Sequence, residues 1–178
     1  FNYYAPLPYY FGELVYLIVH NFILTAKIMF VTTFIFSYLF MYLLARKFWG
    51  KLGGSISAIF YTLAPYHAVD FYIRGAMGEL WGIMLFPALF WAIAKLEEKT
   101  KLSNILLLGI FLAVLIASHN LSTMVFLPFS LLWGMLLFIR KRNKKFLFYG
   151  LVSLFLGISL SAFYLFPMLV EKNLVHVE

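Results

Sequence analysis

Four ionisable side chains of different types lie within one short stretch of an otherwise apolar chain. They are His67, Asp70, Arg74 and Glu79, in the segment APYHAVDFYIRGAMGEL at positions 64–80. If this segment is helical, spacings of three and four residues place the first three side chains on one face. A guanidinium presents a planar set of donors that suits phosphate, and a histidine beside it adds another donor. A phosphate-binding site formed by His67 and Arg74 is therefore one interpretation of the segment.

Other interpretations of the same residues stay open. Placing polar groups at a membrane–water boundary costs little free energy, so these residues could have no specific function. Asp70 and Arg74 could form a local ion pair. Asp70 and Glu79 are weak candidates for a catalytic base, because a carboxylate can accept the proton of a hydroxyl nucleophile. A zinc or copper site made of His67, Asp70 and His119 is disfavoured, since the sequence has no close metal-ligand spacing. We expect no metal site and no cofactor in this stretch of chain, although a divalent cation is possible.

A second cluster lies in SHNLS, residues 118–122, which reads as a tight turn between two apolar segments. Asn120 or Ser122 could cap the helix that follows the turn. Alternatively, His119 projects toward the same cleft as His67, with Asn120 beside it as a further ligand-binding candidate.

The N-terminal segment FNYYAPLPYYFG, residues 1–12, combines prolines with four tyrosines. Its prolines predict an extended start followed by a short helix. Tyrosines at this level commonly anchor a protein in the headgroup region. Tyr3 and Tyr4 could instead stack on a sugar or contact a lipid phosphate, and they are the remaining binding candidates.

The composition places the whole chain in a membrane. Of 178 residues, 64% are hydrophobic and only 12% are charged, and the mean hydropathy is +0.93. Soluble domains carry about 25% charged residues, so this chain has too little polar surface for a water-soluble globule. It contains no cysteine, which excludes disulfides, thiolate metal sites and a cysteine nucleophile.

We predict an all-α integral membrane protein with about six transmembrane helices and one interfacial helix. A span needs about 20 mainly apolar residues. Residues 7–20 are apolar but short and contain Pro8, Gly12 and Glu13, so they suit an interfacial helix within an outer segment at 1–22. We treat 1–178 as a single membrane domain and, because it begins at Phe1, as part of a longer protein. The predicted spans cover 26–44, 53–69, 77–94, 102–118, 121–139 and 146–166.

The distribution of charge predicts the orientation in a cell membrane. Eleven of the 14 Lys and Arg residues follow the first, third and fifth spans, after residues 44, 94 and 139, so these loops are predicted to be cytoplasmic. The net charge of +7 is then a topology signal, and we expect no nucleic-acid partner. Chemistry is expected at the opposite, outer face, where all the histidines fall: His20, His67, His119 and His176.

Small residues spaced four apart predict close helix packing within the membrane. Such pairs occur at Gly78 and Gly82, in the series that starts at Gly109, and in the series that contains Ser153 and Gly157. These patterns favour a compact bundle over loosely associated helices.

Four segments together resemble successive blocks of one family, the 6-pyruvoyl-tetrahydropterin-synthase-related multi-spanning membrane proteins of bacteria and archaea. The segments are FNYYAPLPYYFGELV, APYHAVDFYIRGAMGEL, ASHNLSTMVFLP and SAFYLFPMLVEKNLV. Pterin chemistry is not implied, because the soluble pterin synthase uses a zinc site and a reactive cysteine. The family in turn is similar to the GT-C glycosyltransferases and to the YfhO-like proteins. YYAPLPYY resembles the Pro-Pro-Leu-Tyr-like motif of GT-C enzymes, but its proline spacing differs. The catalytic carboxylate that this resemblance implies would precede Phe1.

Two functions follow as expectations. The first is a glycosyltransferase-like protein that acts at the outer face on a polyprenyl-phosphate-linked sugar. Such a protein is expected to have an apolar groove with aromatic walls for the isoprenoid chain. The alternative is a non-catalytic membrane protein that handles lipids or polysaccharide as a transport or assembly subunit. In both cases the lipid bilayer is a partner, and a lipid-linked sugar is a possible one.

Overall fold

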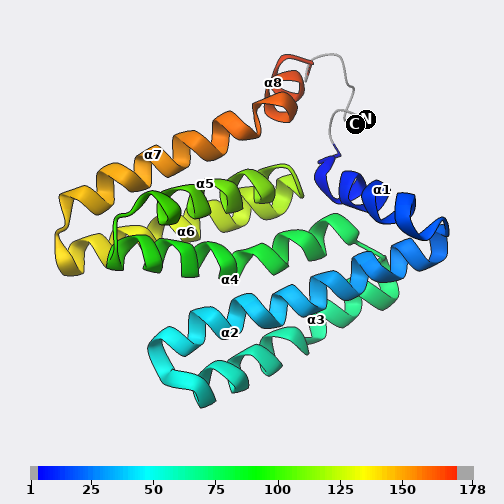
Figure 1. Cartoon of the computed structure of the whole chain (residues 1–178), viewed down its shortest axis with the longest axis horizontal. Helices are drawn as coiled ribbons and strands as arrows, with labels where there is room; N and C mark the ends of the chain where they lie inside the picture. The colour runs from blue at the N-terminus through cyan, green and yellow to red at the C-terminus, as the bar shows by residue number, and fades with distance from the viewer. Residues whose placement is uncertain (1–3, 172–178) are drawn as a thin grey trace.

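The computed structural model describes residues 4–171, and within them the chain is helical throughout apart from short connections (Figure 1). Tyr3 and His176 lie outside the described residues. The prediction of an all-α membrane protein is confirmed. The helices are α1 (Leu7–Val19), α2 (Phe22–Thr62), α3 (Pro65–Ala68), the π-helix η1 (Val69–Arg74), α4 (Met77–Glu98), α5 (Leu102–Ile116), α6 (Asn120–Lys141), α7 (Lys144–Leu160) and α8 (Ala162–Val170).

The helices run back and forth between two ends of one bundle (Figure 1). One end, here named the lysine end, holds the break in α2 at Gly50 and the connections at 99–101 and 142–143. The opposite end, named the histidine end, holds residues 63–76 and the turn at 117–119. The basic loops of the sequence therefore meet at one end, and the His67 segment and the His119 turn meet at the other.

The predicted spans fall within helices, with three differences in how those helices are built. α2 contains the first span and residues 53–62 of the second, because Gly50 adopts φ +70° and ψ −173° and reverses the chain without a longer loop. The rest of the second span lies beyond the end of α2, in α3 and the start of η1. α5 has 15 residues, or about 22 Å of helix, which is less than a bilayer core of about 30 Å. The sixth span is broken, since α7 and α8 meet at a bend of 68°.

Length and composition allow three helices of the described residues to cross a membrane, namely α2, α4 and α6. The number rises to four if the bent pair α7–α8 counts as one span. The remaining apolar helices, α1 and α5, are shorter. The predicted short N-terminal helix is present as α1, whose first residues are tied to the end of α5 by the Leu7 N–H, which donates to the Ala117 carbonyl at 2.9 Å.

The α4 helix is the centre of the bundle and packs on α2, α5 and α6. Pro87 lies inside it and cannot donate to the carbonyl of Ile83. That carbonyl instead accepts a hydrogen bond of 2.7 Å from the hydroxyl of Tyr61, which lies on α2. The tyrosine thus satisfies a backbone group that the proline leaves free, and it ties the second half of α2 to α4.

The α5 and α7 helices pack closely through the predicted small residues. A Cβ atom added to Gly157 would lie 2.7 Å from Leu112 Cβ and 3.0 Å from the Gly109 carbonyl oxygen. Beside them the hydroxyl of Ser153 donates to the Ile105 carbonyl at 3.0 Å. The prediction of small-residue packing is therefore confirmed at this crossing.

Two ion pairs join helices at the lysine end. Lys47 lies 2.7 Å from Glu98, and Lys141 lies 2.6 Å from the buried Glu97. Asn104 closes the end of α4 by donating to the carbonyls of Lys95 and Lys99. At the lysine end, these ion pairs and hydrogen bonds thus fix the helices to one another.

Candidate functional site

The polar segment at the histidine end folds as two short helical pieces. Pro65 begins α3, where a proline is tolerated because the first helical N–H has no partner. The backbone then widens into η1, which ends at Gly75 with φ +58°. The segment is therefore not one continuous helix, because the chain reverses at Gly75. Gly78 lies just beyond this reversal, inside α4.

Arg74 is the centre of a polar cluster, and its guanidinium contacts two carboxylates. Nη1 lies 2.8 Å from Asp70 Oδ1, and Nη2 lies 2.8 Å from Glu79 Oε2. Nη1 also donates to the hydroxyl of Tyr66 at 3.1 Å, and that hydroxyl in turn donates to Glu79 Oε1. One cation thus faces two carboxylates, and the predicted ion pair of Asp70 with Arg74 is present.

Asp70 is the buried member of this cluster. Its side chain has 0% exposure, and its second oxygen, Oδ2, has no hydrogen-bond partner among residues 4–171. Burial raises the pKa of this carboxyl, and the nearby Glu79 raises it further, while Arg74 opposes both effects. Asp70 therefore depends on Arg74 for its charge to be tolerated.

His67 belongs to a different environment from Asp70 and Arg74. Its ring lies between Phe34, at a centroid distance of 5.9 Å, and Tyr61, at 5.3 Å. It is 3% exposed, and neither ring nitrogen has a hydrogen-bond partner within the described part of the chain. Burial lowers the pKa of this imidazole below its ordinary value of 6.5, which favours the neutral ring.

The lowered pKa of His67 predicts a loss of stability in acid. Above the ordinary pKa of 6.5 the ring is neutral in both the folded and the unfolded chain. As pH falls through that value, the ring of His67 binds a proton in the unfolded chain but not in the folded chain, so the free energy of unfolding falls. We expect this dependence to weaken in His67→Phe. Denaturant unfolding in detergent between about pH 8 and about pH 5.5 measures it; parallel curves for the two proteins would contradict the assignment.

His119 caps the α6 helix. The N–H of Ser122 donates to its Nδ1 at 3.2 Å, and the Ser122 hydroxyl lies 2.8 Å from the same nitrogen. The expectation that Asn120 or Ser122 would be the cap is wrong, because an imidazole nitrogen can accept this hydrogen bond just as a side-chain oxygen can. Since Nδ1 accepts, the neutral ring carries its proton on Nε2. Burial lowers the pKa of this imidazole as well.

Two cavities open around these side chains. The larger, here named the polar cavity, has a volume of about 620 Å³ and presents polar groups from four segments of the chain. The second, named the aromatic cavity, has a volume of about 420 Å³ and includes His67. Glu79 and His119 line both cavities. The polar side chains of the polar cavity are those of Tyr4, Tyr9, Arg74, Glu79, Ser118, His119 and Asn120. The ring-bearing side chains of the aromatic cavity are those of Tyr61, Tyr66, His67, Phe86, His119 and Phe126.

The structure therefore brings most of the candidate residues to the histidine end, but it distributes them between two cavities. Arg74, Glu79, His119, Asn120 and Tyr4 line the polar cavity, whereas His67 lines the aromatic one. Asp70 lines neither cavity.

Sequence reasoning did not identify Tyr66 or Tyr61. Neither stands at a spacing that marks a site. Tyr66 gains its role through contacts with Arg74 and Glu79, and Tyr61 through contacts with Ile83 and His67. No group of three His, Asp or Glu side chains within residues 4–171 is arranged to hold a metal ion.

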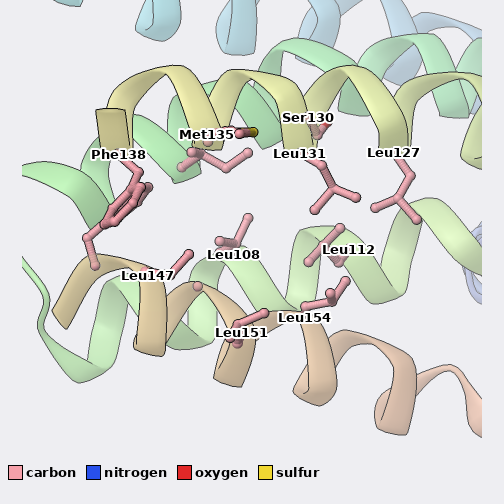
Figure 2. A pocket seen from close by; sticks show the side chains of 14 residues that line it. Leu108, Leu112, Leu127, Ser130, Leu131, Met135, Phe138, Leu147, Leu151 and Leu154 are labelled. Carbon is pink, nitrogen blue, oxygen red and sulfur yellow. The ribbon is translucent and has the colours of Figure 1, made fainter. Parts of the chain in front are cut away.

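A third hollow, a groove between α5, α6 and α7, is almost entirely apolar (Figure 2). Its volume is about 400 Å³, and Figure 2 shows leucines of all three helices around it, with Ser130 among them. An apolar groove was expected to have an aromatic wall, but here leucine dominates, with Phe138 and Phe146 as the aromatic members, and more aromatic rings line the cavity beside His67. The α6 helix contributes Phe126 to the aromatic cavity and Leu127 to the groove, so it stands between them.

Comparison with known proteins gives one family and one distant relative. The family model described as "6-pyruvoyl-tetrahydropterin synthase related domain; membrane protein" matches residues 1–178. An uncharacterized protein of Lactococcus lactis subsp. cremoris (strain MG1363) is 28% identical over 177 residues, which cover 94% of this chain. The chain spans 29% of that relative's length. No solved structure matches the chain.

Proposed function

Because this chain belongs to the family of 6-pyruvoyl-tetrahydropterin synthase related membrane proteins, we propose that it binds the sugar of a lipid-linked saccharide in the polar cavity. The observation that carries this proposal is the composition of the cavity wall, which combines tyrosine rings with a carboxylate, an imidazole and an amide. Such polar groups hydrogen-bond hydroxyls, and the faces of Tyr4 and Tyr9 suit the apolar face of a sugar ring. A cavity of about 620 Å³ has the size of a small-molecule site.

In the proposed complex, a phosphate reaches Arg74 only by exchange with a carboxylate. Both arms of the guanidinium already face carboxylates, Asp70 and Glu79, so an added phosphate would have to replace one of them. Glu79 is the exchangeable partner, because Asp70 is sealed from solvent. In the carrier that we propose, a polyprenyl phosphate, the phosphate would displace Glu79 from Arg74.

That exchange would also supply a base. Once released from Arg74, the Glu79 carboxylate lines both cavities and could accept the proton of an acceptor hydroxyl while the sugar leaves its lipid phosphate. Glu79 is thus better placed than Asp70 for a glycosyltransferase reaction. The histidine end is proposed to face the outside of the cell membrane, with the basic loops in the cytoplasm.

A non-catalytic role is the second candidate, and one observation favours it. Both carboxylates of the cluster are paired with Arg74 in the structure, so neither is free to act as a base. In this case the chain would bind and hand on a lipid-linked saccharide without transferring the sugar. Turnover by the full-length protein separates the two candidates.

Binding of a polyprenyl-phosphate-linked hexose to the full-length protein in lipid nanodiscs tests the proposal. The double variant Tyr4→Ala/Tyr9→Ala is expected to bind about tenfold more weakly, since stacked rings contribute roughly 0.5–1.5 kcal/mol each. Both tyrosines are exposed, so the fold should persist. Native mass spectrometry can count the bound lipid.

The matched control is Tyr72→Ala. Tyr72 is an exposed tyrosine of η1 at the same end of the bundle, and it lines neither cavity. Its removal should leave binding unchanged. Equal binding of the hexose-bearing lipid by the double variant and the unmodified protein would contradict the proposed sugar site.

A further inference from the structure

The aromatic cavity has no part in sugar binding as proposed, yet it contains a buried histidine, His67, that has no hydrogen-bond partner among residues 4–171. We propose that this cavity binds the hydroxyl group of a neutral membrane lipid, a lipid alcohol of the diacylglycerol type, through His67. The proposal goes beyond sugar recognition because it concerns a different cavity and a different ligand.

The ring nitrogens of His67 are free to bind a ligand, because no described residue of the chain forms a hydrogen bond with them. It is 97% buried, as its exposure is 3%, and it lines the cavity with both ring nitrogens unpartnered among residues 4–171. A buried polar group without a partner costs about 1–3 kcal/mol, so a ligand that satisfies it gains that amount. A neutral imidazole has one donor and one acceptor nitrogen, and these point away from each other, so a single hydroxyl pairs with one of them. In the proposed complex the lipid hydroxyl donates to the acceptor nitrogen.

The charges around the cavity exclude a phosphate as the better ligand. Among the described residues that line it, none is Lys or Arg, and the one ionised side chain is Glu79. Arg74 is bound to Glu79 but lines the polar cavity instead. A phosphate would therefore contact a carboxylate and an uncharged imidazole. An alcohol carries no charge, so its binding does not include the free-energy cost of removing a charged group from water.

The rim of the aromatic cavity is apolar on the side where a lipid would enter. Leu121 and Val125 of α6 are 66% and 52% exposed, and both line the cavity. Deeper in, Ile83 and Phe86 of α4 complete an apolar wall. The glycerol end of a lipid could thus reach His67 while its hydrocarbon chains leave past α6 into the bilayer.

Native mass spectrometry of the full-length protein in phosphatidylcholine nanodiscs tests this inference, with 1,2-dioleoylglycerol as the probe. The unmodified protein should bind it about tenfold more tightly than 1,2-dioleoyl-3-acetylglycerol, which lacks the hydroxyl, because one buried hydrogen-bonding group is then left unsatisfied. His67→Phe should bind the alcohol about tenfold more weakly. His67→Gln retains a donor and an acceptor and should recover part of the binding.

The control is His20→Asn, at an exposed histidine of the same end whose φ of +51° asparagine tolerates. It should bind dioleoylglycerol as the unmodified protein does. Equal binding of the alcohol and its acetate would overturn the inference, and this comparison needs no variant to fold. The polyprenyl-linked hexose should still bind to His67→Phe, so failure of the lipid-alcohol site is distinguishable from failure of the sugar site.

Discussion

Replacing Arg74 with glutamine is expected to lower the ratio of folded to unfolded protein by at least about tenfold, because it leaves a buried carboxylate without its cation. Asp70 has 0% exposure, and its Oδ1 contacts Arg74 at 2.8 Å while Oδ2 has no partner in residues 4–171. The carboxyl must then either protonate or remain charged in an apolar setting, and either choice costs stability. Reversible denaturant unfolding in detergent at neutral pH measures the loss.

The double variant Asp70→Asn/Arg74→Gln is the internal control for this prediction. Removal of both charges takes away the uncompensated carboxylate, so stability should return toward that of the unmodified protein. Arg46→Gln is a second control, at an arginine of the lysine end that lies over the ring of Tyr42. If the single Arg74 variant were as stable as the double variant, burial of Asp70 would not be what Arg74 compensates.

The second large effect is expected at the crossing of α5 and α7. Gly157→Ala should destabilise the protein by about 1–3 kcal/mol, the usual cost of overpacking. The added Cβ would lie 2.7 Å from Leu112 Cβ and 3.0 Å from the Gly109 carbonyl oxygen, and neither atom is the end of a flexible side chain. The two helices would have to separate to accept it. Thermal unfolding in detergent checks the prediction.

Gly150→Ala makes the same chemical change on the same helix and is the matched control. A Cβ at Gly150 meets no atom within 4 Å, so this variant should be neutral or slightly stabilising. Similar melting temperatures for the two variants would mean that α5 and α7 do not depend on close backbone approach.

Sequence periodicity and charge predicted much of this fold for clear physical reasons. Apolar runs of span length must be helical in a membrane, since no other local structure satisfies the backbone there. Small residues spaced four apart, in the series that starts at Gly109 and in the series that contains Ser153 and Gly157, predicted the close crossing at Gly157. A connection between residues 44 and 53 was predicted, but not that the chain would reverse at Gly50 inside one helix. The bend between α7 and α8 was not anticipated, because it depends on how one element packs after it forms.

The candidate site shows the same division between local and tertiary information. The pair Asp70 and Arg74 follows from a spacing of four residues, and the structure contains it. His67 shares that spacing but faces Phe34 and Tyr61, since the backbone widens at η1 and the ring packs against α2. The meeting of the N-terminal tyrosines with Arg74 and His119 joins segments far apart in sequence, and no periodicity could show it.

The wall that the two cavities share has a thermodynamic consequence. Glu79 and His119 line both cavities, so we expect that either proposed ligand, once bound, contacts groups that the other ligand also meets. Binding of the two ligands is then linked, and linkage is reciprocal: whatever factor a saccharide imposes on the affinity for a lipid alcohol, the alcohol imposes on the affinity for the saccharide. Titration of one ligand at fixed concentrations of the other would yield that single coupling free energy from both directions.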